Sequence, residues 1–144
     1  MLMVREITEQ DWEVAKKLYC DSFHKNYVAT TLPLLGTVLG LYLEEELIGL
    51  VQIDWIHDVF DNRKIAYINN FCIQENVRHQ GYGDKLLKEC ISFLENMGVD
   101  SIQLTSNKNR VYAHQLYQKN HFEVVDTVFL KKDLDSHSKS DHVI

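Results

Sequence analysis

The sequence has little proline, few cysteines and no long apolar run. It contains 1 Pro and 3 Cys among 144 residues, and the cysteines are scattered rather than paired at metal-binding spacing. We therefore expect neither a disulfide framework nor a metal site, in a reducing intracellular setting. No apolar stretch is long enough to cross a bilayer, and residues 1–7 lack the basic and then apolar layout of a signal peptide. We therefore expect a cytoplasmic protein with no membrane partner.

Basic residues are also scarce. Lys and Arg together number 15 against 21 Asp and Glu, which gives a formal net charge of −6. Nucleic-acid binding usually requires a basic face, so we expect no nucleic-acid partner. The negative charge is compatible with a cationic substrate such as an amine, although it serves solubility equally well.

Apolar residues recur at both alternating and helical spacings, which predicts a mixed α/β protein. Strands are predicted for residues 3–7, 37–43, 47–56, 65–73 and 101–105, with one or two more within 122–131. Helices are predicted for residues 9–23, 82–97 and 109–119. Residues 25–35 are expected to form a short helix or a loop that breaks near Pro33. This order favours one domain over residues 1–134, with a largely antiparallel central sheet flanked by helices, and a polar tail over 135–144.

A glycine turn separates the predicted strand 65–73 from the helix that follows it. Its sequence is Arg78-His79-Gln80-Gly81-Tyr82-Gly83-Asp84. A strand, a glycine turn and a helix place free backbone N–H groups at a helix start, where they can hold a phosphate. The glycines permit a sharp turn and a close approach, and Arg78 adds a fixed positive charge. The turn therefore predicts a phosphorylated cofactor, although an ordinary structural turn would look the same by itself.

A second motif lies on the last predicted helix and just beyond it. It reads Ala113-His114-Gln115-Leu116-Tyr117-Gln118-Lys119-Asn120-His121-Phe122-Glu123. With Arg78-x-x-Gly81-x-Gly83 before it, in this order and on these elements, the chain resembles the GCN5-related N-acetyltransferase superfamily. The resemblance implies a GNAT-like fold and transfer of an acetyl group from acetyl-CoA directly to an amine of a small molecule or peptide. Homodimers are usual among relatives, and no feature of this sequence requires one.

The resemblance also implies where acetyl-CoA contacts the chain. Backbone groups of the strand 65–73 are expected to hold the pantetheine arm, where this strand and the strand 101–105 splay apart. The backbone N–H groups of the glycine turn are expected to wrap the pyrophosphate. The implied cofactor contacts are Phe71, Cys72, Ile73, Arg78, His79, Gln80, Gly81, Tyr82, Gly83, Asp84, Asn109 and Arg110.

Tyr117 is the candidate general acid. A phenol has a pKa near ~10, so it stays protonated at neutral pH and can donate to a departing thiolate. In a helix, Arg110, Ala113, His114 and Tyr117 share one face, so His114 is a second candidate that could relay a proton. A packing or surface role for His114 is the simpler interpretation.

Three departures from the superfamily pattern affect the turn after the last helix and the identity of the base. His121 replaces the usual glycine before Phe122, which predicts a reshaped turn. Arg110 stands where relatives often carry an Asn. Asn69 and Thr105 occupy positions where many relatives have a carboxylate base, and neither side chain can act as a base at neutral pH.

The base and the activity therefore stay open. A water chain could carry the proton, and the weak side-chain candidates are Asp54, His57 and Asp58. The missing carboxylate also supports an alternative function, a non-catalytic acyl-CoA-binding sensor or interaction module on the same fold. A third alternative is an unrelated nucleotide-phosphate binder that shares only the glycine turn.

Overall fold

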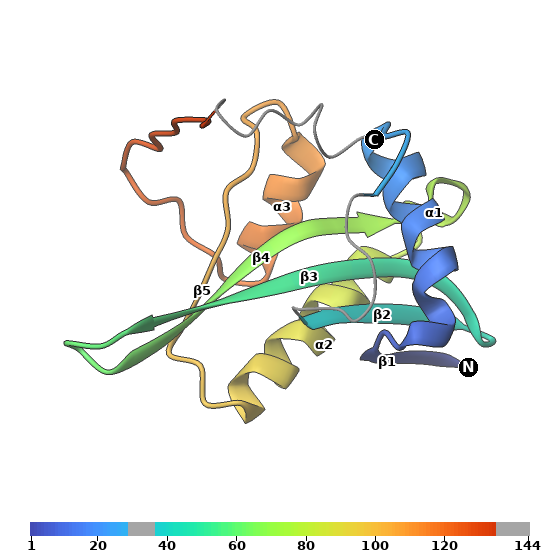
Figure 1. Cartoon of the computed structure of the whole chain (residues 1–144), viewed down its shortest axis with the longest axis horizontal. Helices are drawn as coiled ribbons and strands as arrows, with labels where there is room; N and C mark the ends of the chain where they lie inside the picture. Colours follow the sequence, from blue (N-terminus) through green and yellow to red (C-terminus); the bar gives the residue numbers. More distant parts are fainter. Residues whose placement is uncertain (29–36, 135–144) are drawn as a thin grey trace.

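A computed structural model describes residues 1–28 and 37–134 and shows one five-stranded sheet with helices on both faces (Figure 1). The elements in chain order are β1 (Leu2–Glu6), η1 (Glu9–Asp11), α1 (Trp12–Phe23), β2 (Thr37–Leu43), β3 (Glu46–Asp58), β4 (Arg63–Ile73), η2 (Glu75–Val77), α2 (Tyr82–Asn96), β5 (Ser101–Gln103) and α3 (Val111–Lys119). The strands lie in sequence order, antiparallel from β1 to β4, and β5 pairs parallel to β4. The predicted mixed, largely antiparallel sheet in one domain is confirmed.

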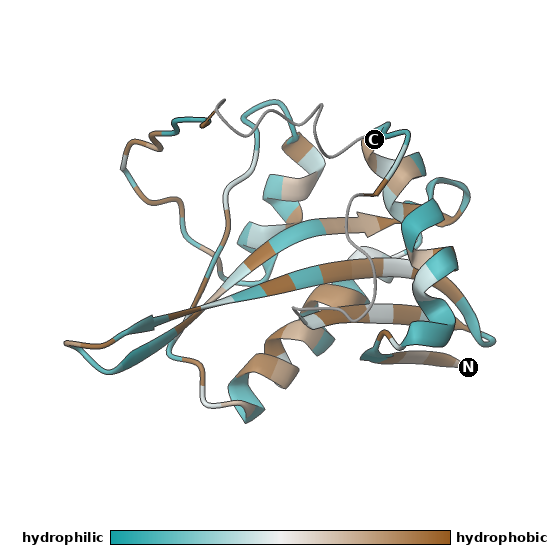
Figure 2. Cartoon of the chain, viewed as in Figure 1, coloured by the Kyte–Doolittle hydropathy of each residue, from teal (hydrophilic) through white to brown (hydrophobic). Residues whose placement is uncertain are grey.

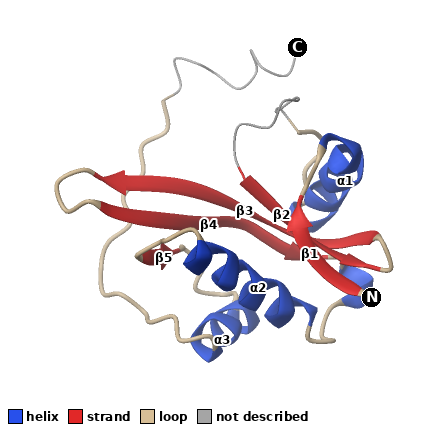
Figure 3. Cartoon of the chain, turned by 90° about the horizontal axis from the view of Figure 1, so that it is seen from below, coloured by secondary structure: helices blue, strands red, loops and turns tan. Residues whose placement is uncertain are grey.

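Helix α1 covers one face of the sheet, and α2 and α3 cover the other (Figure 3). Successive residues of a strand point to opposite faces of the sheet, so β2 and β3 contribute side chains both to the layer under α1 and to the layer under α2 and α3. Leu41, Val51 and Ile53 are fully buried with α2, whereas Leu50 packs with Ala15 and other residues of α1. Hydrophobic residues accordingly dominate β2 and the central part of β3 (Figure 2).

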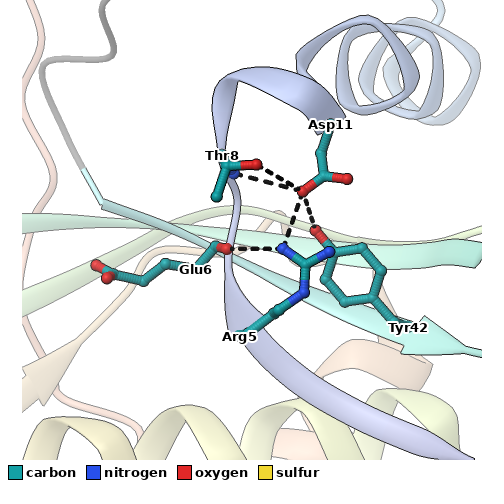
Figure 4. Close-up of polar contacts among 5 residues, drawn as sticks. All are labelled: Arg5, Glu6, Thr8, Asp11 and Tyr42. Atoms are coloured by element: carbon teal, nitrogen blue, oxygen red, sulfur yellow. Dashed lines mark hydrogen bonds and ion pairs between the residues drawn. The ribbon is translucent and has the colours of Figure 1, made fainter. Parts of the chain in front are cut away.

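The start of α1 is fixed to the sheet by one carboxylate. Oδ2 of Asp11 accepts hydrogen bonds from Arg5 Nη1 and the Tyr42 hydroxyl, both at 2.9 Å, and from the Thr8 hydroxyl at 3.2 Å (Figure 4). Burial alone would raise the pKa of Asp11, but the hydrogen bonds from Arg5 and Tyr42 lower it below its usual value. The Arg5 guanidinium also lies 3.9 Å from the centre of the Tyr42 ring. The predicted first helix therefore begins where expected, with η1 as its first turn.

Helices α1, α2 and α3 are each followed by a residue in the left-handed conformation, His24 after α1, Gly98 after α2 and His121 after α3. Gly98 follows α2 with φ of +75°, as predicted. His121 follows α3 with φ of +68°, and the N–H groups of His121 and Phe122 reach the carbonyls of Gln118 and Tyr117 at 3.0 Å. The prediction of a reshaped turn is wrong, because His121 adopts the conformation that a glycine would take.

The predicted strands within 122–131 are also wrong. Residues 122–134, named here the C-terminal arm, form no regular element and run away from the sheet (Figure 1). A strand requires a hydrogen-bonded neighbour, and β5 ends at Gln103 instead of 105 with β4 as its only partner in the described sheet. The expected helix or loop near Pro33 lies mostly outside the described residues, as does the predicted tail. None of the helices within 1–28 and 37–134 has the length and hydrophobicity that crossing a membrane requires.

Candidate active site

Strands β4 and β5 part after three paired residues. The parallel ladder joins Ile65–Tyr67 to Ser101–Gln103 and then stops, while β4 continues to Ile73. On the side of β5, the edge of β4 over residues 68–73 therefore has no strand partner within residues 1–28 and 37–134. Beyond β5, the Ser106 hydroxyl oxygen is buried without a hydrogen-bond partner among the described residues. The expected divergence is thus present, and a buried polar atom lies just beyond the end of β5.

A bulge interrupts β4 beside this divergence. Cys72 pairs with Leu50 and Asn69 with Gln52, so two residues of β4, Asn70 and Phe71, stand opposite one residue of β3. Asn70 has a φ of +54°, a left-handed conformation that Asn tolerates better than most residues. Its Nδ2 donates to Gln52 Oε1 at 2.8 Å. Because bulges redirect side chains and free backbone groups, this one shapes the edge exposed to β5.

The glycine turn provides open space at the start of α2. Gly81 is the N-cap with φ of +86°, and a Cβ built there would meet nothing within 4 Å. The first N–H groups of a helix have no partner within the helix, so those at the start of α2 can donate to a ligand. Arg78 Nε donates to the Ile73 carbonyl at 2.8 Å, which holds the guanidinium at the end of β4. Gln80 is exposed, and the His79 ring contacts the Tyr112 ring of α3 at 5.6 Å.

Tyr117 packs against the divergent edge. Its ring lies 6.2 Å from the Phe71 ring and 5.6 Å from the Phe122 ring, centre to centre. Burial raises the pKa of the Tyr117 phenol, while the positive charge of Arg110 lowers it in part. The phenol is therefore protonated at neutral pH, as a proton donor requires. Arg110 is the N-cap of α3, and the carbonyl of Arg110 accepts the N–H of half-buried His114 at 3.1 Å.

Cys72 faces away from Tyr117. Its side chain is buried against α1, whereas Phe71 lies on the face of α3. Burial raises the pKa of the Cys72 thiol, although a hydrogen bond with Ser22 opposes this. A protonated thiol is a poor nucleophile, so the geometry gives no support to a covalent acyl-enzyme through this residue.

A cleft of about 610 Å³ adjoins the glycine turn. It lies between the end of α1 and η2, and Lys25 and Arg78 line it together with Asp21 and Glu75. A ligand held at the turn therefore has room on the side of α1 as well.

A family model described as the acetyltransferase (GNAT) family matches residues 1–122 of this sequence. The chain belongs to that family. A curated relative, "GCN5-related N-acetyltransferase 6, chloroplastic" from Arabidopsis thaliana, is 30% identical over 66 residues, which cover 46% of this chain and 23% of that protein. The chain spans less than a quarter of the length of the curated relatives it matches, at 23% and 18%.

Solved structures of acetyltransferases share the fold. The ribosomal-protein-alanine N-acetyltransferase from Brucella melitensis biovar Abortus 2308 superposes with a TM-score of 0.78 at 12% identity, covering 92% of this chain and 100% of that one. AAC(6')-Iy, in complex with the bisubstrate analogue CoA-S-monomethyl-acetylneamine, gives a TM-score of 0.79 at 12% identity, covering 93% and 99%. At these identities the similarity establishes the fold alone.

In this GNAT chain, Asp84 links two helices. Its carboxylate accepts hydrogen bonds from Asn120 and Lys88 at 2.9 Å, and Lys119 lies 3.7 Å away. The hydrogen bond from Asn120 lowers the pKa of Asp84, with Lys88 assisting against the effect of burial. The side chain therefore holds the start of α2 against the end of α3 and leaves only its N–H for a ligand. Gly83 beside it faces α3, where a Cβ would lie in ordinary contact 3.5 Å from Leu116.

Two of the three candidate bases belong to the β3–β4 hairpin, which projects from the body (Figure 1). His57 Nε2 lies 3.1 Å from Asn62 Oδ1, and Asp58 accepts the N–H groups of Phe60 and Asp61. His57 is five residues beyond Gln52, about 17 Å along the strand. These side chains shape the hairpin turn, and the structure does not bring them to the divergence. Asp54 is the one candidate that lies near the bulge.

Sequence reasoning missed part of the polar surface around the bulge. Tyr67 and Thr105 share a hydrogen bond of 2.6 Å between their hydroxyls, across the point where the strands part. Asn69 Oδ1 accepts the N–H of Asn70 at 3.0 Å. The Asn69-Asn70 pair was the available signal, because adjacent Asn residues in a strand favour local side-chain bonds over a regular ladder. Within residues 1–28 and 37–134, no group of three or more His, Cys, Asp or Glu could hold a metal ion.

Proposed function

We propose that this chain is an acetyl-CoA-dependent N-acetyltransferase that acts directly on an amine. The observation that carries the proposal is the free edge of β4 lying between two features, the open N-terminus of α2 and the protonated phenol of Tyr117. The pyrophosphate would bind the N–H groups of the turn, with Arg78 at its mouth. The pantetheine arm would lie along Phe71–Ile73 and use backbone groups that β5 leaves unpaired.

The proposed reaction needs no covalent enzyme intermediate. Acetyl-CoA supplies the thioester, and a neutral amine attacks its carbonyl carbon at the bulge. The C–N bond forms, the C–S bond breaks, and Tyr117 donates its proton to the departing thiolate. A backbone N–H at the bulge would stabilise the oxyanion, a contribution worth roughly 3–4 kcal/mol in other acyl transfers. The proton of the amine would pass through water and restore the phenol of Tyr117, because Asn69 and Thr105, which stand where many relatives carry a carboxylate base, are neutral.

The decisive experiment replaces Tyr117 with Phe. Released thiol is measured with acetyl-CoA and a panel of amines: neamine, 1,4-diaminobutane, glucosamine and a peptide with a free N-terminal Ala. The general-acid role predicts that kcat falls about 10²–10⁴-fold while the affinity for acetyl-CoA stays unchanged. Tyr112→Phe on the exposed face of the same helix is the control and should keep full activity.

The same experiment separates the alternative function. A non-catalytic acyl-CoA sensor would bind acetyl-CoA in both proteins and release no thiol with any amine. The observation that favours the sensor is the neutral pair Asn69 and Thr105 where relatives often carry a carboxylate. Binding of acetyl-CoA without turnover across the panel would therefore contradict our proposal.

A further inference from the structure

A chain of hydrogen bonds leads from the β4 bulge to an acidic side chain on β3. Asn70 Nδ2 donates to Gln52 Oε1 at 2.8 Å, and Gln52 Nε2 donates to Asp54 at 3.0 and 3.2 Å. The two contacts fix the Gln52 amide, with its oxygen toward the bulge and its nitrogen toward the carboxylate. The bulge and Asp54 are thus parts of one ordered polar surface.

The Asp54 carboxylate has no cationic partner among residues 1–28 and 37–134. Asp11 and Asp84, which are also part-buried, each pair with an Arg or a Lys, and part-buried Asp58 accepts two backbone N–H groups of its own hairpin turn. Asp54 is half-buried, and within the described part of the chain it receives hydrogen bonds only from the neutral Gln52 amide. A carboxylate has about four acceptor positions, so several stay available for a ligand. Its charge favours a cation, and the net charge of −6 acts in the same direction.

The position of Asp54 sets how far such a cation lies from the reacting centre. Gln52 and Asp54 point to the same face of the sheet as Leu50, the face that α1 covers further along β3. Asp54 pairs with Tyr67 and Gln52 with Asn69 at the bulge. Two residues of strand separate the bulge from Asp54 by about 7 Å. An extended diamine with four carbons spans this separation, with the Tyr67 ring on the same face beside its charged end.

We propose that Asp54 anchors a second ammonium group of a polyamino acceptor whose reacting amine lies at the β4 bulge. The inference rests on the proposed function and narrows its acceptor to compounds with two or more amino groups. The second ammonium stays charged and pairs with Asp54, while the reacting amine is the group that loses its proton. Gln52 and Asn70 are positioning residues that hold the carboxylate and the bulge in register.

The test compares 1,4-diaminobutane with n-butylamine on the full chain. Equilibrium binding is measured by calorimetry in the presence of CoA, which carries no acetyl group to transfer, and released thiol is measured separately in the presence of acetyl-CoA. The wild-type protein should bind the diamine more tightly than the monoamine, and Asp54→Asn should remove most of this preference, a change of about 10-fold or more. Binding and turnover of n-butylamine should stay unchanged. Asp54→Glu, which keeps the charge, should restore part of the preference, and thermal unfolding confirms that each variant is folded.

Asp58→Asn is the matched control, because it removes a charge from the same strand but keeps an oxygen for the hairpin turn. Its preference for the diamine should equal that of the wild type. Equal binding of the two amines by the wild type, or an unchanged preference in Asp54→Asn, would overturn the assignment of Asp54. Selective binding of the diamine without released thiol would instead preserve the subsite and contradict the proposed acetyl transfer.

Discussion

At the scale of single residues, His121 carries a conformation that glycine would adopt at less cost. Its φ of +68° closes the turn that ends α3. A side chain in the left-handed region costs about 1–2 kcal/mol of strain. Glycine avoids this strain but loses more backbone entropy on folding, so the net gain in stability is smaller than the strain itself. We expect His121→Gly to raise the free energy of unfolding by about 0.5–1 kcal/mol.

Urea unfolding measures this change, and Gln115→Gly is the control. Gln115 is exposed in the interior of the same helix, where glycine should lower stability by about 1 kcal/mol. Opposite signs for the same new residue would identify the backbone conformation as the cause. A loss of stability in His121→Gly would show that the imidazole makes a contact worth more than the strain.

Residue scale is also where the sequence was least informative about the site. Gly81 and Tyr117 could be predicted as site residues because a glycine turn before a helix can hold a phosphate and a phenol can donate a proton. The structure places the start of α2 and the Tyr117 ring beside the same edge of β4. The Gln52–Asp54 contact could not be selected, because polar residues two apart on a strand are ordinary surface residues until a bulge brings Asn70 to them. His57 was a candidate base only because imidazole can accept a proton, and the structure shows that its side chain contacts Asn62 within the β3–β4 hairpin.

At the scale of elements, Asp84 joins α2 and α3 and should make stability depend on pH. Its folded pKa is lowered, so the stability it contributes is fully present above the unfolded value of 3.8 and is lost as the pH falls through the folded pKa. We expect Asp84→Asn to lower the free energy of unfolding by about 1 kcal/mol near neutral pH, a value discounted for partial exposure. The difference from the wild type should be smaller at about pH 3, which lies below the unfolded value, than near neutral pH, because the unfolded chain then binds the proton more readily than the folded one.

Chemical unfolding at both pH values tests this, with Asp21→Asn as the control. Asp21 pairs with Lys17 on the exposed surface of α1, and such pairs contribute little to stability. A loss of equal size in the two variants would mean that net charge, and not the link between the helices, sets the effect.

The spacing of apolar residues in the sequence predicted the strands and helices that pack against the two faces of the sheet. Strands β2, β3 and β4 alternate against two apolar layers, and the stripe of α2 faces one of them, so pattern and structure agree. It failed for residues 122–131, where Val124-Val125 and Val128-Phe129-Leu130 are apolar on both faces. Such a segment can adopt an extended conformation, but it forms a strand only where a neighbouring strand is available for backbone hydrogen bonds. The residues of the segment itself do not show whether such a neighbour exists.

At the scale of the whole molecule, the C-terminal arm should be the most protease-sensitive part of the described chain. Beyond half-buried Phe122, its large apolar side chains are 69–85% exposed, and its backbone has no strand or helix to protect it. Proteases cleave such segments first. With trypsin, we expect the earliest product to end at Lys131 or Lys132, well before any cut at Lys88 within α2. Mass spectrometry of a digestion time course identifies the order of cleavage. An arm that outlasts α2 would show that another surface covers these side chains in solution, and repeating the digestion over a range of protein concentrations would then reveal whether a second copy provides it.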